Sequence, residues 1–429
     1  MLSLTTLDAF IEKHYSGRKP TDSVLRTYRQ RIGANGLSNG SSIDESDLLL
    51  KDALVFVSDR PNYFFMRVSD VLRRHGIRTV LVTRWGVEPS QARFFNHIIL
   101  YDELTDLKHL KKCRNCKIYV QSWVGWNILP VYVQKITGDE IYCNINDLTS
   151  LLFDDPEHGN LIGLSRPEME MDLRCEKLIM ETFPFVTLPY KPVHIDDISP
   201  GLSQRVDKHI FYFTCYPSAS FFRQPLPSAA EKDHKLLFVG GIPPDKNPDA
   251  VFRYAKIQDI VRKLLSQAVR LTILNNPQIS LGNVQKETLY PYFEELSKNH
   301  ENFTFRDGIP PWQFKGWNHP FHYGLMLYSF QNLVISKKHY QCIVPSKLFT
   351  YAELGLPVLV SDGMLAVSEL VNTHQIGCVI KDQEIDHLDR QLAEDATDYD
   401  NRLHHLYQFR ERFEIGSVLQ PFVASHFKI

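Results

Sequence analysis

The strongest constraint on the fold is a repeated order of apolar run, helical pattern and second apolar run. Ala53–Ser58 is a continuous apolar run, which is typical of a strand buried on both faces of a sheet. Residues 61–75 have a helical pattern that stops at Gly76, and Ile77–Thr83 is a second strand pattern. A strand, a crossover helix and a strand form a right-handed βαβ unit, which requires a parallel sheet. The pattern therefore predicts an α/β fold.

The same order returns in the second half of the chain. Lys235–Val239 has a strand pattern, a helical pattern runs through Asp249–Leu265, and Val269–Leu274 is again a strand pattern. The 429 residues are enough for about two domains of roughly 100–200 residues each. We expect further strands at His97–Leu100, Lys117–Gln121, Glu140–Asn144, Lys177–Met180, Asn302–Gly308, Tyr323–Tyr328 and Ile376–Ile380.

Bulk properties restrict the compartment and the partners. The net charge of −2 gives no general attraction to nucleic acid. No apolar segment reaches the roughly 18 residues of a membrane-spanning helix, and the first residues lack the layout of a secretion signal. Seven scattered cysteines are typical of a reducing compartment. We therefore expect a cytoplasmic protein, with peripheral membrane contact and oligomeric state left open.

Metal binding finds little support in the cysteines. Cys113 and Cys116 form a CxxC pair, but a second pair at zinc spacing is absent from the sequence. We expect neither a metal site nor a bound cofactor.

The stretch from Pro345 to Ser361 has the pattern of a loop, a short helix, a tight stop and a buried strand. Pro345 suits the first turn of a helix, and Ser346 can cap its free amides. Gly355 suits the left-handed residue that ends a helix, and Pro357 prevents continuation. A helix start beside strand ends favours an anion, because free amides and the helix dipole both attract negative charge.

This stretch resembles the donor-site signature of family-4 glycosyltransferases of the GT-B fold, which commonly read Pro-x-Lys-Leu-x-Glu-Tyr-x-Ala-x-Gly-x-Pro-Val. The positions that match in register are Pro345, Lys347, Leu348, Tyr351, Gly355, Pro357 and Val358. The family's glutamate before the tyrosine, which typically holds the donor ribose, is Thr350 here, and its partner glutamate is Cys342. The usual pair of glutamates is therefore missing.

The resemblance implies a GT-B fold, in which two Rossmann-like domains face each other across a cleft. It also implies a donor site on the second domain, formed by Gly240, Gly241, Lys246, Asn275, Ser346, Lys347, Leu348, Thr350 and Tyr351. Glycines let the backbone approach a phosphate closely, and a lysine neutralises its charge. A plain turn at a strand end explains Gly240 and Gly241 equally well.

Polar and aromatic residues after the strands of the first half are candidates for the acceptor site. Asp59 follows the first strand, Trp123 and Trp126 follow the strand that ends at Gln121, and Asp147 follows a later one. Ligand loops lie at the carboxyl ends of parallel strands. Asp147 suits the orientation or deprotonation of an acceptor hydroxyl, and it equally suits the cap of a following helix.

Taken together, the patterns predict a divided chain. We expect a helical extension at residues 1–50, an acceptor domain at 51–215, a proline-rich linker at 216–234, a donor domain at 235–395, and C-terminal helices at 396–429 that pack back on the first domain.

The resemblance implies a glycosyltransferase that moves a sugar from a nucleotide-diphosphate sugar to a hydroxyl acceptor. It implies retention of configuration and no catalytic metal, in polysaccharide or glycoconjugate biosynthesis. The acceptor would be a carbohydrate, a lipid-linked group or a protein-linked group. Two alternatives remain open: a nucleotide-sugar epimerase of the same architecture, and a non-catalytic protein that binds nucleotides or sugars.

Overall fold

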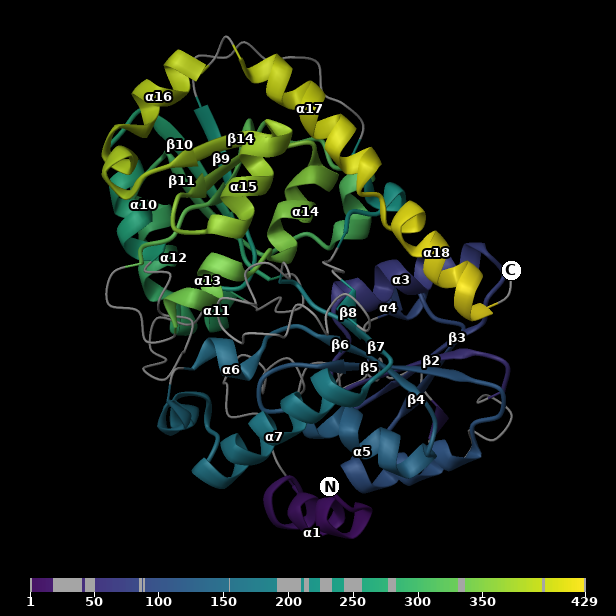
Figure 1. Ribbon diagram of the computed structural model, residues 1–429. Helices are drawn as coiled ribbons and strands as arrows, with labels where there is room; N and C mark the ends of the chain where they lie inside the picture. Colours follow the sequence, from purple (N-terminus) through teal and green to yellow (C-terminus); the bar gives the residue numbers. More distant parts are fainter. Residues whose placement is uncertain are drawn as a thin grey trace. The chain divides into compact units, whose positions relative to one another are not determined.

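The computed structural model describes residues 2–17, 41–42, 51–84, 87, 89–153, 155–190, 210–211, 216–223, 234–242, 257–276, 283–330, 336–395 and 398–427. They form two compact units, one of residues 1–215 and 419–429 and the other of residues 216–418. Each unit contains a parallel β-sheet with helices packed on it (Figure 1). None of the helices in these ranges is both long and apolar enough to cross a bilayer.

The sheet of the first unit has eight parallel strands in the order β1-β4-β3-β2-β5-β6-β7-β8. The strands are β1 (Ser41–Ser42), β2 (Leu54–Ser58), β3 (Thr79–Thr83), β4 (His97–Leu100), β5 (Lys117–Ser122), β6 (Ile141–Ile145), β7 (Phe185–Thr187) and β8 (Ile210–Phe211). The helices are α1 (Leu4–His14), α3 (Tyr63–Arg74), α4 (Pro89–Ala92), η2 (Leu104–Lys112), α5 (Ile128–Thr137), α6 (Thr149–Leu152), η3 (Pro156–Ile162) and α7 (Arg166–Thr182). In Figure 1, α5 and α7 lie on one side of this sheet and α3 on the other.

The expected strand at Lys177–Met180 is wrong, because these residues belong to α7. Ser165 and Glu168 form a capping box at the start of this helix, which continues through Thr182. A four-residue apolar segment fits a helix as well as a strand, and the capping box decides for the helix here. The next strand of the sheet is β7, at Phe185–Thr187.

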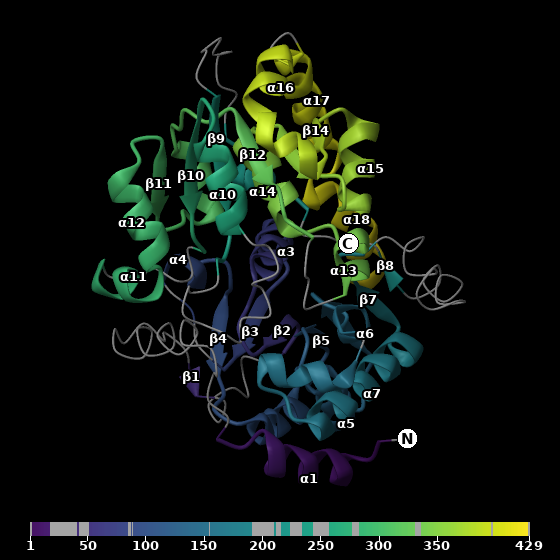
Figure 2. The ribbon, with the colours of Figure 1, turned by 90° about the vertical axis from the view of Figure 1, so that its left-hand side faces the viewer.

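The sheet of the second unit has six parallel strands in the order β11-β10-β9-β12-β13-β14. They are β9 (His234–Val239), β10 (Val269–Leu274), β11 (Phe303–Arg306), β12 (Tyr323–Met326), β13 (Val358–Ser361) and β14 (Gly377–Ile380). The helices are η4 (Ala219–Phe221), α10 (Ile257–Leu265), α11 (Asn283–Leu289), α12 (Pro291–Asn299), η6 (Pro311–Gly316), α13 (Lys337–Cys342), α14 (Ser346–Leu354), α15 (Leu365–His374), η7 (Asp382–His387), α16 (Leu388–Asp395), α17 (Tyr399–Arg412) and α18 (Ile415–Phe427). Figure 2 shows α12 beside β11, and α14 and α15 near β12 and β14.

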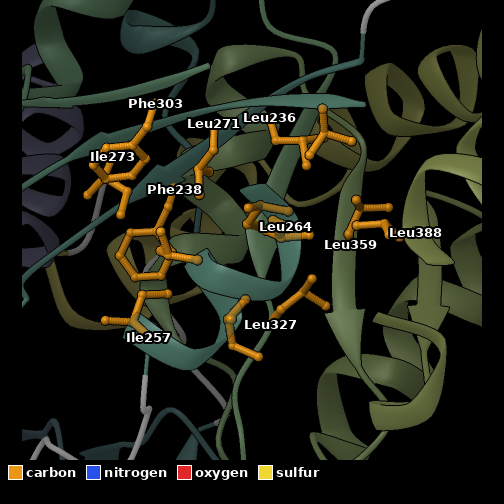
Figure 3. Packing of buried hydrophobic residues seen from close by; sticks show 14 of the residues in the cluster. Leu236, Phe238, Ile257, Leu264, Leu271, Ile273, Phe303, Leu327, Leu359 and Leu388 are labelled. Atoms are coloured by element: carbon orange, nitrogen blue, oxygen red, sulfur yellow. The ribbon is translucent and has the colours of Figure 1, made fainter. Parts of the chain in front are cut away.

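The core of the second unit lies between one face of its sheet and α10. Leu236, Phe238, Leu271 and Ile273 project from β9 and β10 toward this helix, and all four are buried (Figure 3). Burying one such side chain contributes about 1.5–3 kcal/mol relative to leaving it exposed. The sheet is therefore a firm support for the loops at its edge.

The helices at both ends of the chain pack on the described units, while the expected limits at residues 50 and 396 stay a prediction. Helix α1 packs on α5, where the Tyr132 hydroxyl donates to Asp8 over 2.7 Å. Helix α17 contacts α14 and α15, so it belongs to the second unit. The part of α18 from Leu419 onward groups with the first unit, and Phe422 packs against Tyr142 and Phe185. The chain therefore returns to the first unit within its last helix.

Candidate functional site

Lys347, in the first turn of α14, lies over the carboxyl end of β9. Its Nζ donates to the Tyr328 hydroxyl over 2.8 Å and lies 3.8 Å from the centroid of the Phe238 ring. Burial lowers the pKa of Lys347 from 10.5 to about 7. A buried ammonium without a carboxylate or phosphate is costly, and a bound anion relieves that cost.

Gly240 makes room for the lysine. Its φ is +128°, and a Cβ at this position would lie 2.5 Å from Cε of Lys347. Only glycine combines this backbone conformation with such a close approach. The next turn is held by Asn275, whose Oδ1 accepts from the amides of Ile242 and Asn276 over 3.1 and 2.8 Å. Asn275 is buried and shapes the turn, and its contact with the donor stays a prediction.

The start of α14 lies beside this lysine. Pro345 occupies the cap position in extended conformation, and no side chain of the described residues caps the helix. The expectation that Ser346 is the cap is therefore wrong, since Ser346 is the first helical residue. It is exposed, and the Thr350 hydroxyl donates to its carbonyl over 3.1 Å. The end of a helix with free amides attracts anions, so this helix start and Lys347 are suited to the same negative group.

Tyr351 and Leu348 pack inside the second unit, and the prediction that they touch the donor stays a prediction. Both are fully buried. The Tyr351 hydroxyl accepts from the Val239 amide over 3.1 Å and donates to the Leu325 carbonyl over 2.7 Å, which ties β9 to β12. Along the helix, Thr350 lies one turn from both Ser346 and Lys347, whereas Tyr351 lies one turn from Leu348 and from Lys347.

The sequence patterns did not predict Tyr328 as part of this neighbourhood. Tyr328 is a partner of Lys347 that no local motif marks, because only the fold brings it there. Cys342, at the position of the family's missing glutamate, is buried at the end of α13. Lys246 lies outside the described residues.

In the first unit, Asp147 follows β6 and is half-buried. Burial raises its pKa to about 6. The cap hypothesis fails, because Leu148 is at the cap position of α6 and the first-turn amides of Thr149 and Ser150 donate to Glu176. Asp147 is therefore a carboxylate with a raised pKa at the carboxyl edge of a parallel sheet, where ligand loops lie.

A buried carboxylate on α7 holds the loops beside Asp147. Asp172 accepts from the amides of Gly125 and Asn127 over 3.0 and 2.8 Å and from the Thr149 hydroxyl over 2.6 Å. These bonds join the loop after β5 to the start of α6. Rigid support of this kind keeps side chains at a sheet edge in place.

The remaining candidates of the first unit interact with arginines. The buried Asp59 lies 3.8 Å from Arg84, measured between Oδ1 and a guanidinium nitrogen, and its contact with the acceptor stays a prediction. Arg84 also lies over the Trp126 ring, at 5.9 Å from its centroid. Trp123 is half-buried, with Arg60 over its ring at the same distance.

Metal ligands do not gather within the part of the chain that the structure describes. No group of three or more His, Cys, Asp or Glu side chains in these ranges is placed to hold an ion.

Comparison with known proteins finds similarity in structure and not in sequence. No protein-family model and no curated protein sequence matches the chain. The solved structure of HepE from Anabaena, in complex with UDP and glucose, superposes with a TM-score of 0.58 at 8% identity, covering 89% of this chain and 100% of HepE. Sucrose-phosphate synthase from Thermosynechococcus elongatus superposes with a TM-score of 0.56 at 13% identity, covering 88% and 99%. The chain has two α/β units, each with a parallel sheet, and its C-terminal residues group with the first unit. The chain therefore has the GT-B fold.

Proposed function

We propose that this chain is a glycosyltransferase that moves a sugar from a nucleotide-diphosphate sugar to a hydroxyl acceptor. The observation that carries the proposal is the meeting of Lys347, Gly240 and the uncapped start of α14 at the carboxyl end of β9. HepE, which shares the fold, was solved with UDP and glucose. Its ligands support a nucleotide sugar as the donor here.

The diphosphate of the donor would lie against Lys347 and the first-turn amides of α14. The cost of transfer lies in the charge that develops on the departing diphosphate, and preorganised amides and cations stabilise such charge. A pKa of about 7 means that free Lys347 is only partly charged at neutral pH. The dianionic group would raise this pKa and hold the proton on Nζ, which strengthens the contact at the moment the bond breaks.

Thr350 would lie next to the ribose, since it shares the face of α14 that carries Ser346 and Lys347. Its hydroxyl is already bonded to the Ser346 carbonyl, but its oxygen keeps lone pairs for a second bond. A hydroxyl binds ribose less strongly than the family's carboxylate does. We therefore propose a weaker donor contact here, with the diphosphate providing most of the affinity.

Asp147 would orient the acceptor hydroxyl or take its proton. A carboxyl group with a pKa near 6 is ionised at neutral pH and is a stronger base than an ordinary aspartate. We propose retention of configuration and catalysis without a metal. The acceptor is a carbohydrate hydroxyl, either free or carried on a lipid or a protein.

The experiment is a donor panel with separated readouts. Purified protein is incubated with UDP-, GDP- and ADP-sugars, with and without a mixture of oligosaccharide and lipid-linked acceptors. Release of nucleoside diphosphate that depends on the acceptor, together with a new glycoside in mass spectra, is the expected result. A changed sugar on an intact nucleotide would identify an epimerase. Tight nucleotide binding without any product would identify a binding protein, which the missing glutamate pair at Thr350 and Cys342 makes the main competing function.

A further inference from the structure

The second unit contains a hollow that lies away from Lys347, on one face of β10 and β11. Its volume is about 730 Å³, and its floor and walls come from these strands, from the start of β9 and from residues 317–321. This volume suits a ligand of two to four sugar rings, since pockets for small ligands span roughly 300–1,000 Å³. Neither Gly240 nor the start of α14 lines it.

The two faces of these strands differ sharply in character. Leu271, Ile273, Phe303 and Phe305 turn to the core beneath α10 and α12. The alternate positions carry Arg270, Thr272, Thr304 and Arg306, and both arginines are exposed. Parallel sheets are usually covered on both faces and have apolar residues throughout. The polar side chains show that this part of the sheet is made to face water.

The connection from β11 to β12 explains why the face is open. Parallel strands are normally joined through a crossover helix that covers the sheet. Here residues 307–322 contain only the short helix η6, which packs on α14 and η4. Among the described residues, this connection therefore leaves one face of β10 and β11 uncovered, and its residues 317–321 line one side of the hollow.

That side is aromatic. The centroid of the Trp317 ring lies 4.9 Å from that of His319 and 5.9 Å from that of Phe321, and Trp317 and Phe321 are half-buried. The Arg223 guanidinium bonds to the His319 ring over 2.9 Å, and burial lowers the pKa of His319 to about 3, so this ring is neutral. Flat apolar rings beside hydroxyl and guanidinium donors form a surface on which a sugar ring can stack and be hydrogen-bonded.

We propose that this hollow is a binding site for a short acidic oligosaccharide, with carboxylated sugar units. The uronate groups would pair with Arg306 and Arg270, and a ring face would stack on Trp317. Nucleic acid fits less well, because a chain with a net charge of −2 has no general attraction to a long polyanion. Glu301 and Asp307 also line the hollow, where their carboxylates can accept hydrogen bonds from sugar hydroxyls. The site does not depend on the proposed transfer reaction.

The test uses oligogalacturonate of four units as the probe and a neutral cellotetraose as its comparison. Binding is followed by isothermal titration and by tryptophan fluorescence at low and physiological salt. We expect the acidic probe to bind at least tenfold more tightly than the neutral one, because pairing with arginine is charge-assisted. Added salt should weaken the binding of the acidic probe.

Variants localise the binding. Arg306→Gln should weaken binding of the acidic probe about tenfold, and Trp317→Ala should weaken binding of both probes. Arg262→Gln, which changes an exposed arginine of α10 outside the hollow, is the matched control and should bind as the parent does. Circular dichroism and thermal melting confirm that each variant is folded. Equal affinity for the two probes, or equal affinity in Arg306→Gln and the parent, would overturn the proposal.

Discussion

The pKa of Lys347 makes the proposed nucleotide site testable through pH. In the free protein this pKa is about 7, lowered by burial from 10.5. Only the charged form can pair with a diphosphate, and the bound anion would raise the pKa. Above pH 7 the free lysine must therefore take up a proton on binding. Each further pH unit should weaken the affinity about tenfold, or 1.4 kcal/mol, until the pKa of the complex is reached.

The assay is isothermal titration with UDP, GDP and ADP between pH 6.5 and 9, in buffers of different ionisation enthalpy. For the nucleotide that binds, the dissociation constant should rise on the order of a hundredfold from pH 7 to 9. The buffer dependence should give an uptake of roughly half a proton at pH 7 and nearly one at pH 8.5. Lys347→Met should bind weakly, with no such uptake.

As the pH rises, the contribution of Lys347 to the free energy of unfolding should increase, whereas the affinity for the nucleotide should decrease. Because the folded pKa of Lys347 lies below the unfolded one, the unfolded chain binds more protons between about pH 7 and 10.5. The contribution of this residue to stability therefore rises with pH across that window. Lys347→Met removes the buried charge and should stabilise the unliganded protein at pH 7 by about 1–4 kcal/mol.

Lys298→Met, at an exposed lysine of α12 paired with Glu287, is the control and should change neither binding nor its pH dependence. A nucleotide affinity that is the same at pH 7 and 9 in the parent would refute both the placement of the nucleotide at Lys347 and the pKa of this lysine near 7. Equal affinity of Lys347→Met and the parent would refute the role of the lysine.

Three further substitutions test the other residues to which roles are assigned. Gly240→Ala places a methyl group against Lys347 in a strained backbone conformation. It should lower the free energy of unfolding by about 1–3 kcal/mol and weaken nucleotide binding in titrations. Unchanged binding would show that this turn does not contact the diphosphate. Tyr351→Phe leaves the Val239 amide and the Leu325 carbonyl without their bonds to the tyrosine hydroxyl. Denaturant melts should show that the free energy of unfolding falls by about 1–3 kcal/mol, while nucleotide affinity is kept. A loss of affinity in the folded variant would show that Tyr351 contributes to donor binding. Asp147→Asn should lower transfer on the order of 10²–10⁴-fold and remove the rise of the rate with pH near 6, while nucleotide affinity stays; an unchanged pH profile would exclude a base role.

The helices and strands near the proposed site follow from local patterns. Residues 345–361 form a helix, a left-handed stop at Gly355 and a buried strand, as turn chemistry and apolar runs predict. The order of these patterns predicted two α/β domains with parallel sheets, and the resemblance of the donor-site stretch implied the GT-B fold. Lys177–Met180 shows where this reasoning fails, because a short apolar run fits either structure and the capping box upstream decided it.

By itself the sequence determined the two α/β units, the helix start that carries Lys347, and the glycine turn after β9. Tertiary structure alone decided which side chains meet. Tyr351 and Val239 are 112 residues apart, and only their contact shows that the tyrosine ties strands together. Glu176, from another helix, caps α6 and thereby releases Asp147 from that role. Local patterns record the conformation of each segment, whereas burial and hydrogen-bond partners depend on segments distant in the chain. That is why the hollow beside β10 and β11, which residues 307–322 border without a full crossover helix, has no motif of its own.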